Sequence, residues 1–214
     1  MNNQNPPKMY SMFDVVSQDN GIYYIENVLS YPDELLSHVM DLELQEDSYQ
    51  RISEWSDWHA SDDKSILYGQ SKTIYSDQFI TPLQNEILQR KTLYIKNSIA
   101  MAAEMSVSKY LSNNGLDREQ YKFNDDNYYI KKWNVGSFMG PHSDGNYSDN
   151  NLALSIVIYL NDNYDGGEIS FPEKNITIKP KLGSAIIFSS NEMHEVLPVK
   201  NGDRYMSPKH MYRV

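Results

Sequence analysis

Cysteine is absent from this chain of 214 residues, which removes several kinds of chemistry at once. Disulfides, thiolate metal sites and cysteine nucleophiles are excluded, and a reducing, cytoplasmic setting is expected. Positive charge is scarce as well: the chain has 19 Lys and Arg residues and 29 Asp and Glu residues, and its net charge is −10. Such a surface repels a phosphate backbone, so we expect no nucleic-acid partner and a leaning towards basic peptides.

Long hydrophobic runs are also missing. About 40% of the residues are hydrophobic, but no unbroken apolar run approaches the roughly twenty residues that cross a bilayer. The N-terminal stretch has no basic segment followed by an apolar one, so no secretory signal is expected. We therefore expect no membrane partner and a single domain over residues 1–214.

The first part of the chain is predicted to be mainly helical. Residues 1–19 are polar and are expected to form a loose arm, and residues 21–30 are typical of a strand that enters a turn. A helix is predicted over 30–44, because apolar residues recur at helical spacing and a proline lies in its first turn. The longest helical pattern lies within 80–115 and ends at Gly115, a common helix stop.

Residues 46–66 lie between these helices and show no clear period. A long irregular segment in a compact domain is usually functional or disordered. One interpretation is a lid in which Trp55 and Trp58 face the substrate, and the other is that both tryptophans pack on the core. We therefore describe residues 20–115 as helical support with a candidate lid.

Short β-rich runs separated by turn signals follow from about residue 120. The run "LALSIVIYL" is apolar nearly throughout, as expected of a strand buried on both faces, and Asn201-Gly202 is a strong hairpin signal. Helices followed by about eight short strands predict an α+β fold. Its core would be a jelly roll, or double-stranded β-helix, over residues 120–214, with N-terminal supporting helices.

Two metal-binding side chains, His142 and Asp144, lie one residue apart in "GPHSDGNY". On a strand they would point to the same face, because side chains alternate. His194, at the start of "HEVLPV", is a better third ligand than His38 on a helix or His59 in the irregular segment. Two histidines and one carboxylate leave coordination positions open, as in non-haem Fe(II) oxygenases. The pair alone is also common as loop polarity.

Two further residues support a site that binds a dicarboxylate. Arg204 lies on the strand after the predicted hairpin, where it can approach the metal. A guanidinium holds a carboxylate with two parallel hydrogen bonds, and a 2-oxo acid that chelates iron needs such an anchor at its far end. Tyr159, at the end of "SIVIYLN", can donate another hydrogen bond. Each has an ordinary alternative, a surface charge for Arg204 and a packed aromatic residue for Tyr159.

Taken in order, the motifs over about residues 120–207 resemble the prolyl 4-hydroxylase branch of the 2-oxoglutarate- and Fe(II)-dependent oxygenases. They are an aromatic residue and a glycine before H-x-D (Trp133, Gly136), "YLN" ending at Asn161, "GG" at Gly166 and Gly167, "P-x-x-G" from Pro180, and "V-x-x-G-x-R-Y" from Val199.

The resemblance implies that His142, Asp144 and His194 bind Fe(II) and that Arg204, Tyr159 and Trp133 contact 2-oxoglutarate. It implies a dioxygenase that hydroxylates an unactivated C–H bond of a prolyl residue in a peptide or protein. O2 and 2-oxoglutarate would be consumed, succinate and CO2 released, and ascorbate would be an auxiliary reductant.

Two positions depart from the family pattern and leave alternatives open. Trp133 stands where the family often has a tyrosine whose hydroxyl contacts the cosubstrate, and His210 where it usually has tryptophan. Both put the proline substrate in doubt, so a hydroxylase of a free amino acid or another small molecule is the alternative. Other classes are a non-oxygenase metal protein on the same fold, such as a zinc hydrolase or a cupin-like binding module, and a degenerate scaffold.

If Arg204 is not the residue that anchors 2-oxoglutarate, Lys209 is the next candidate.

Overall fold

The structure of the protein is a computed structural model that describes residues 15–19, 21–44, 56–58, 71–75, 86–123, 129–146 and 151–214. Trp55 and His59 lie outside these ranges, as does most of 46–66, so the lid interpretation stays a prediction. Within that segment only Ser56–Trp58 is described, as a β-strand.

The larger of two facing sheets has the strand order β1-β2-β12-β8-β15-β6-β4-β3, and β5 pairs with β15 outside this order. Its pairings are antiparallel, and β15 lies in the middle between β8 and β6. The strands are β1 (Val15–Asp19), β2 (Ile22–Ile25), β3 (Ser56–Trp58), β4 (Ser71–Tyr75), β5 (Tyr121–Phe123), β6 (Tyr129–Trp133), β8 (Leu152–Tyr159), β12 (Ala185–Ser189) and β15 (Arg204–Arg213).

The smaller sheet has the order β11-β10-β13-β7, and β14 and β9 form a separate two-stranded ladder. A buried apolar cluster joins the two facing sheets, since Tyr159 and Met206 of the larger sheet lie in it together with Ile169 and Val196 of the smaller one. This is the layering of a jelly roll. The strands are β7 (Met139–His142), β9 (Asp165–Gly166), β10 (Ile169–Phe171), β11 (Ile176–Ile178), β13 (His194–Val196) and β14 (Val199–Asn201).

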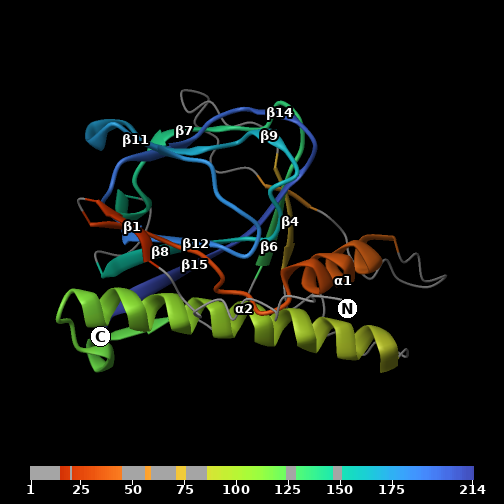
Figure 1. The fold of residues 1–214 in the computed structure, drawn as a ribbon, viewed down its shortest axis with the longest axis horizontal. Helices are drawn as coiled ribbons and strands as arrows, with labels where there is room; N and C mark the ends of the chain where they lie inside the picture. The colour runs from red at the N-terminus through yellow and green to blue at the C-terminus, as the bar shows by residue number, and fades with distance from the viewer. Residues whose placement is uncertain are drawn as a thin grey trace, which may run out of the picture.

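Helices α1 (Pro32–Leu44) and α2 (Glu86–Asn113) cover the opposite face of the larger sheet (Figure 1). The alternation of β8 explains why its sequence is apolar throughout: Ile156 and Ile158 pack in the cluster with the helices, whereas Val157 and Tyr159 face the smaller sheet. The helix predicted to end near Gly115 does so, since Gly115 takes a φ of +63° beyond the last turn.

The expectation of a loose arm over residues 1–19 needs correction at its end. Val15–Asp19 forms β1, an antiparallel partner of β2. Backbone hydrogen bonding to a neighbouring strand outweighs the polar composition of the segment. Such pairing cannot be predicted from the local sequence.

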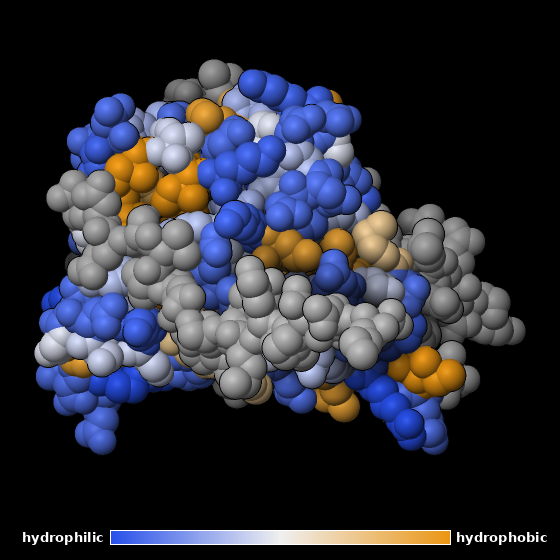
Figure 2. Space-filling view, in the orientation of Figure 1, coloured by the Kyte–Doolittle hydropathy of each residue, from blue (hydrophilic) through white to orange (hydrophobic). Residues whose placement is uncertain are grey.

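None of the helices in the described ranges has the length and hydrophobicity to span a bilayer. One face of the molecule is mostly hydrophilic with separate hydrophobic patches (Figure 2), in keeping with the net charge of −10.

Candidate active site

The two histidines of the predicted triad come from neighbouring strands of the smaller sheet. His142 ends β7, His194 begins β13, and the two residues are direct partners in the antiparallel ladder. The prediction that Asp144 lies on the same strand as His142 is wrong, because Asp144 begins a short 3-10 turn after that strand ends. The turn, rather than strand alternation, brings the carboxylate back towards the histidines.

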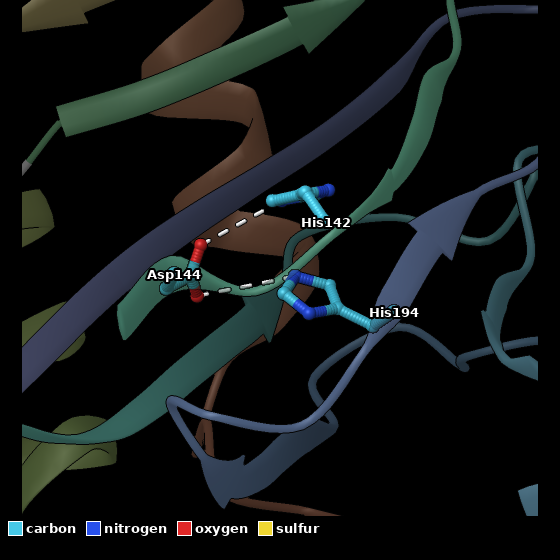
Figure 3. A group of neighbouring side chains, drawn as sticks. All are labelled: His142, Asp144 and His194. Carbon is cyan, nitrogen blue, oxygen red and sulfur yellow. Dashed lines mark ion pairs between the residues drawn. The ribbon is translucent and has the colours of Figure 1, made fainter. Parts of the chain in front are cut away.

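The three side chains converge on one point (Figure 3). The Nε2 of His142 lies 3.6 Å from Oδ1 of Asp144, and the Nε2 of His194 lies 3.9 Å from Oδ2. One ligand atom from each residue falls within 4.8 Å of the other two. Both histidines are buried, and Asp144 is half-buried.

Backbone carbonyls select the histidine tautomer that can bind a metal. Nδ1 of His142 lies 2.9 Å from the carbonyl oxygen of Gly140, and Nδ1 of His194 lies 3.0 Å from that of Glu192. A carbonyl oxygen only accepts, so each Nδ1 carries the proton and donates it. The lone pair of each Nε2 is then directed at Asp144, the arrangement found for histidine ligands of metals.

The surroundings keep Asp144 ionised and His194 neutral. Burial opposes ionisation of Asp144, but His142, His210, His194 and a hydrogen bond from Ser155 outweigh it and hold the pKa of the carboxyl below its usual value. Ser155 Oγ donates to Oδ2 of Asp144 at 2.5 Å. Burial also lowers the pKa of His194, although Asp144 opposes this shift. Carboxylate and neutral imidazole are the protonation states that metal binding requires.

A second part of the site lies on the larger sheet around Arg204. Its guanidinium is fully buried, and none of its three nitrogens has a hydrogen-bond partner among the described residues. The guanidinium carbon lies 5.2 Å from the ring centroids of both Trp133 and Tyr159. The Trp133 Nε1 and the hydroxyls of Tyr159 and Tyr164 are also buried and unpartnered among these residues.

These donors fit a carboxylate. A buried charge or polar group without a partner is costly, so a cluster of such groups indicates a ligand that satisfies them. Arg204 offers the planar fork that matches a carboxylate, and Tyr159 and Tyr164 can add hydroxyl donors. Burial raises the pKa of Tyr159 above its usual value, although Arg204 opposes the shift, so its hydroxyl keeps the proton that it would donate.

The Gly166-Gly167 pair explains how Arg204 is packed. A Cβ on Gly167 would lie 3.0 Å from Cδ of Arg204 and 3.2 Å from Cε2 of Tyr164, and Gly167 has a φ of +66°. A Cβ on Gly166 would lie 2.1 Å from the carbonyl oxygen of Pro198. The "GG" motif is therefore required by close backbone approach and by left-handed conformation.

One cavity of about 220 Å³ joins the two parts of the site. Its lining includes the triad, Arg204, Tyr159, Trp133 and His210. Lys209, the alternative anchor, is not among the lining residues, and its Nζ lies 5.4 Å from the Phe123 ring centroid. The structure therefore brings His142, Asp144, His194, Arg204, Tyr159 and Trp133 to one cavity and leaves Lys209 outside its lining.

Sequence reasoning missed three residues at this site. Ser155 holds Asp144, Tyr164 adjoins Arg204, and Lys131 lines the cavity. Burial lowers the pKa of Lys131 to about 8; Asp144 opposes this shift and Arg204 adds to it. A signal for Lys131 was present, because it lies two residues before Trp133 in a predicted strand and so shares its face.

Part of the sequence is similar to those of known proteins. Residues 127–212 match the family model of the 2OG-Fe(II) oxygenase superfamily. A PKHD-type hydroxylase from Prochlorococcus marinus is 38% identical over 77 residues, which are 34% of this chain and 35% of the relative. Such matches span about a third of the length of the curated relatives.

Solved structures match over more of the chain. A viral collagen prolyl hydroxylase from Paramecium Bursaria Chlorella virus-1, solved as a 2OG complex, has a TM-score of 0.57 and 17% identity over 93% of this chain and 99% of its own. A prolyl hydroxylase from Trichoplax adhaerens, solved with a hypoxia inducible factor peptide fragment, has a TM-score of 0.59 and 19% identity over 91% of this chain and 84% of its own. These likenesses confirm the predicted α+β fold with a jelly-roll core.

Residues 127–212 are therefore similar in sequence to the 2OG-Fe(II) oxygenase superfamily, and the fold of most of the chain is similar to that of the solved prolyl hydroxylases, a similarity that the motifs predicted.

Proposed function

We propose that the chain is a 2-oxoglutarate- and Fe(II)-dependent dioxygenase that hydroxylates a C–H bond of a prolyl residue in a peptide or protein. In the balanced reaction the substrate C–H, O2 and 2-oxoglutarate give the substrate C–OH, succinate and CO2. One observation carries the proposal: the His142, Asp144, His194 group and the unpartnered Arg204 guanidinium line the same cavity.

Each residue has a defined task. His142 and His194 present Nε2 lone pairs and Asp144 presents a carboxylate, and these three groups would hold the metal. Arg204 and Tyr159 would bind the far carboxylate of 2-oxoglutarate and so hold the cosubstrate in the cavity. When bound, iron and 2-oxoglutarate supply the oxidising chemistry. Apolar wall residues such as Val157 and Ile169 exclude water from it.

The solved relatives support a peptide or protein substrate. One is a collagen prolyl hydroxylase, and another was solved with a peptide fragment of hypoxia inducible factor. Trp133 and His210, which differ from the family pattern, both line the cavity. They bear on which peptide is accepted rather than on the metal ligands.

Turnover of 2-oxoglutarate tests the proposal. Purified protein with Fe(II), ascorbate, O2 and 2-oxoglutarate should form succinate, and proline-containing peptide libraries should gain one oxygen by mass spectrometry. Asp144→Ala should abolish both products. His38→Ala is the matched control, because His38 lies outside the cavity, where its Nε2 is 3.8 Å from Glu34. Full succinate formation by Asp144→Ala with bound iron would contradict the proposed role.

A further inference from the structure

Three buried side chains of the cavity, which we call the Arg204 subsite, carry hydrogen-bond donors that the described residues do not satisfy. Arg204, Trp133 and Tyr159 all line the cavity, and no more than 2% of any of them is exposed. The guanidinium nitrogens, the indole Nε1 and the Tyr159 hydroxyl have no hydrogen-bond partner in the described part of the chain. Because a buried donor without an acceptor is costly, a ligand of this subsite is expected to accept from all three side chains.

A single carboxylate offers too few acceptors for the Arg204 subsite. A guanidinium, an indole and a phenol together carry about seven donor hydrogens, whereas an ionised carboxylate has about four lone-pair sites. The oxygen of Tyr159 can itself accept an N–H group, but a surplus of donors remains. The far carboxylate of 2-oxoglutarate therefore accounts for the presence of Arg204, but it does not use all of the donors around this residue.

The donors also reach the subsite from three neighbouring strands. Arg204 lies on β15, Trp133 is its ladder partner on β6, and Tyr159 lies on β8, on the other side of β15. The guanidinium carbon is 5.2 Å from the ring centroid of each aromatic residue. A carboxylate oxygen accepts best near the plane of its own group, whereas the oxygens of a tetrahedral anion point in several directions. Donors on three strands therefore suit a tetrahedral anion better than a planar one.

We propose that the Arg204 subsite also binds a tetrahedral oxyanion, inorganic phosphate or sulfate, in competition with 2-oxoglutarate. The arginine fork pairs with two oxygens of such an anion as it does with a carboxylate, and further oxygens remain for the indole N–H and the tyrosine hydroxyl. The competition rests on the proposed function, whereas the binding of the oxyanion does not. Turnover of 2-oxoglutarate would then fall as the concentration of the oxyanion rises.

Tyr164 adds a donor beside the guanidinium, although it is not among the residues that line the cavity. A Cβ on Gly167 would lie 3.0 Å from Cδ of Arg204 and 3.2 Å from Cε2 of Tyr164, so the two side chains converge next to this glycine. Cε2 is bonded to the ring carbon that carries the hydroxyl, and this hydroxyl is also buried and unpartnered among the described residues. Burial raises the pKa of Tyr164 and Arg204 opposes the shift, in agreement with their proximity.

Anion binding by the metal-free protein tests the oxyanion site. Phosphate, sulfate and acetate are titrated by calorimetry without metal, so that no anion binds through a metal ion, and sodium chloride keeps the ionic strength equal. Arg204→Met removes the guanidinium, whereas Tyr159→Phe removes one hydroxyl and keeps the ring. Arg90→Met and Tyr94→Phe are the matched controls, because these residues lie on α2 and are not among the residues that line the cavity.

Phosphate or sulfate should bind the wild-type protein at least about tenfold more tightly than acetate, because each further hydrogen bond to a charged group contributes about that factor. Arg204→Met should lower the affinity roughly hundredfold and Tyr159→Phe about tenfold, while both controls keep the wild-type affinity. A difference between phosphate and sulfate shows which of the two anions the subsite prefers.

Protein loaded anaerobically with Mn(II) tests the competition. The apparent Kd of 2-oxoglutarate should rise in proportion to the concentration of the preferred oxyanion, and sodium chloride at the same ionic strength should leave it nearly unchanged. Titration of the oxyanion into Mn(II)-loaded Arg204→Met measures any binding to the metal itself, which is subtracted.

Three results would overturn the inference. These are phosphate and sulfate that bind no more tightly than acetate, oxyanion binding that keeps its wild-type affinity in Arg204→Met, and a 2-oxoglutarate Kd that is unchanged when the oxyanion is well above its own Kd. If Mn(II)-loaded wild type binds no 2-oxoglutarate, the proposed function fails, whereas Arg204-dependent binding of phosphate by the metal-free protein still supports the oxyanion site.

Discussion

Arg204 and Trp133 are direct partners in the β15–β6 ladder, and the guanidinium carbon of Arg204 lies 5.2 Å from the indole ring centroid. Tyr159 lies at the same distance from it. Two aromatic rings therefore hold the guanidinium by cation–π attraction while its N–H groups remain unpartnered among the described residues. These side chains are therefore already arranged in the absence of the proposed carboxylate, which would reduce the ordering that its binding requires.

Replacement of Arg204 should weaken the binding of 2-oxoglutarate without lowering the stability of the protein. Arg204→Met removes a buried cation, so the melting temperature of the ligand-free protein should rise or stay level. Affinity for 2-oxoglutarate should fall roughly ten- to hundred-fold or more. Arg204→Lys should recover part of this affinity, because a point charge keeps the attraction and loses the fork. Arg213→Ala, exposed at the far end of β15, is the control for calorimetry. Unchanged 2-oxoglutarate affinity in Arg204→Met would refute the assignment.

Two glycines allow backbone strain to be separated from packing against the anchor. Gly167 and Gly115 both have a left-handed backbone, with φ of +66° and +63°, but a Cβ on Gly115 would meet open space. Alanine at either position should destabilise the fold by about 1–2 kcal/mol through strain. Only Gly167→Ala should also weaken 2-oxoglutarate binding, because its Cβ would press on Arg204. Equal binding by both variants in calorimetry would exclude this steric role.

Ser155 should matter to metal affinity although it is not a proposed ligand. Its hydroxyl donates to Asp144 at 2.5 Å and lies 3.4 Å from Nδ1 of His210. Ser155→Ala should lower Fe(II) affinity by about ten- to hundred-fold, the usual effect of losing a group that orients a ligand. Ser112→Ala, at an exposed position of α2, is the control. A competitive chelator titration measures the affinity, and no change in it would show that Asp144 is held without Ser155.

The metal-free protein should lose stability as the pH falls from 7 to 5. Burial lowers the pKa of His194 below its ordinary 6.5, so in this window the unfolded chain binds a proton that the folded chain resists. One such group contributes a slope of at most about 1.4 kcal/mol per pH unit. The low pKa of Asp144 acts in the same direction, but only below its ordinary 3.8. Urea unfolding of His194→Gln should therefore show a shallower dependence on pH than wild type. If stability changes with pH at the same rate in His194→Gln and wild type, the result contradicts this prediction.

The order of the motifs along the chain was more informative about the site than the local hydrophobic pattern. His142, Asp144, His194, Arg204, Tyr159 and Trp133 were all expected at the site from their sequence context, and one cavity contains them. Helical periodicity located both helices, and the apolar run of β8 indicated burial on two faces. Long helices and two-sided burial leave a signal that a single sequence contains.

Features that depend on distant partners could not be predicted. β1 is a short strand of mixed polarity that pairs with β2, and its own sequence does not reveal this partner. Asp144 reaches the histidines through a 3-10 turn that H-x-D spacing does not reveal. The spacing of Lys131 from Trp133 indicates a shared strand face, but a lysine in a strand is ordinarily exposed, and the burial of Lys131 is evident only from the cavity.

The central place of β15 has a consequence for how the protein acquires its fold. β15 pairs with β5, β6 and β8, which all precede it by long stretches of chain. Until β15 inserts, β6 and β8 have open edges that can pair with other chains. Contacts between such distant segments form slowly. We therefore expect slow refolding with a concentration-dependent loss to aggregation, and expression at low temperature should raise the yield of folded protein.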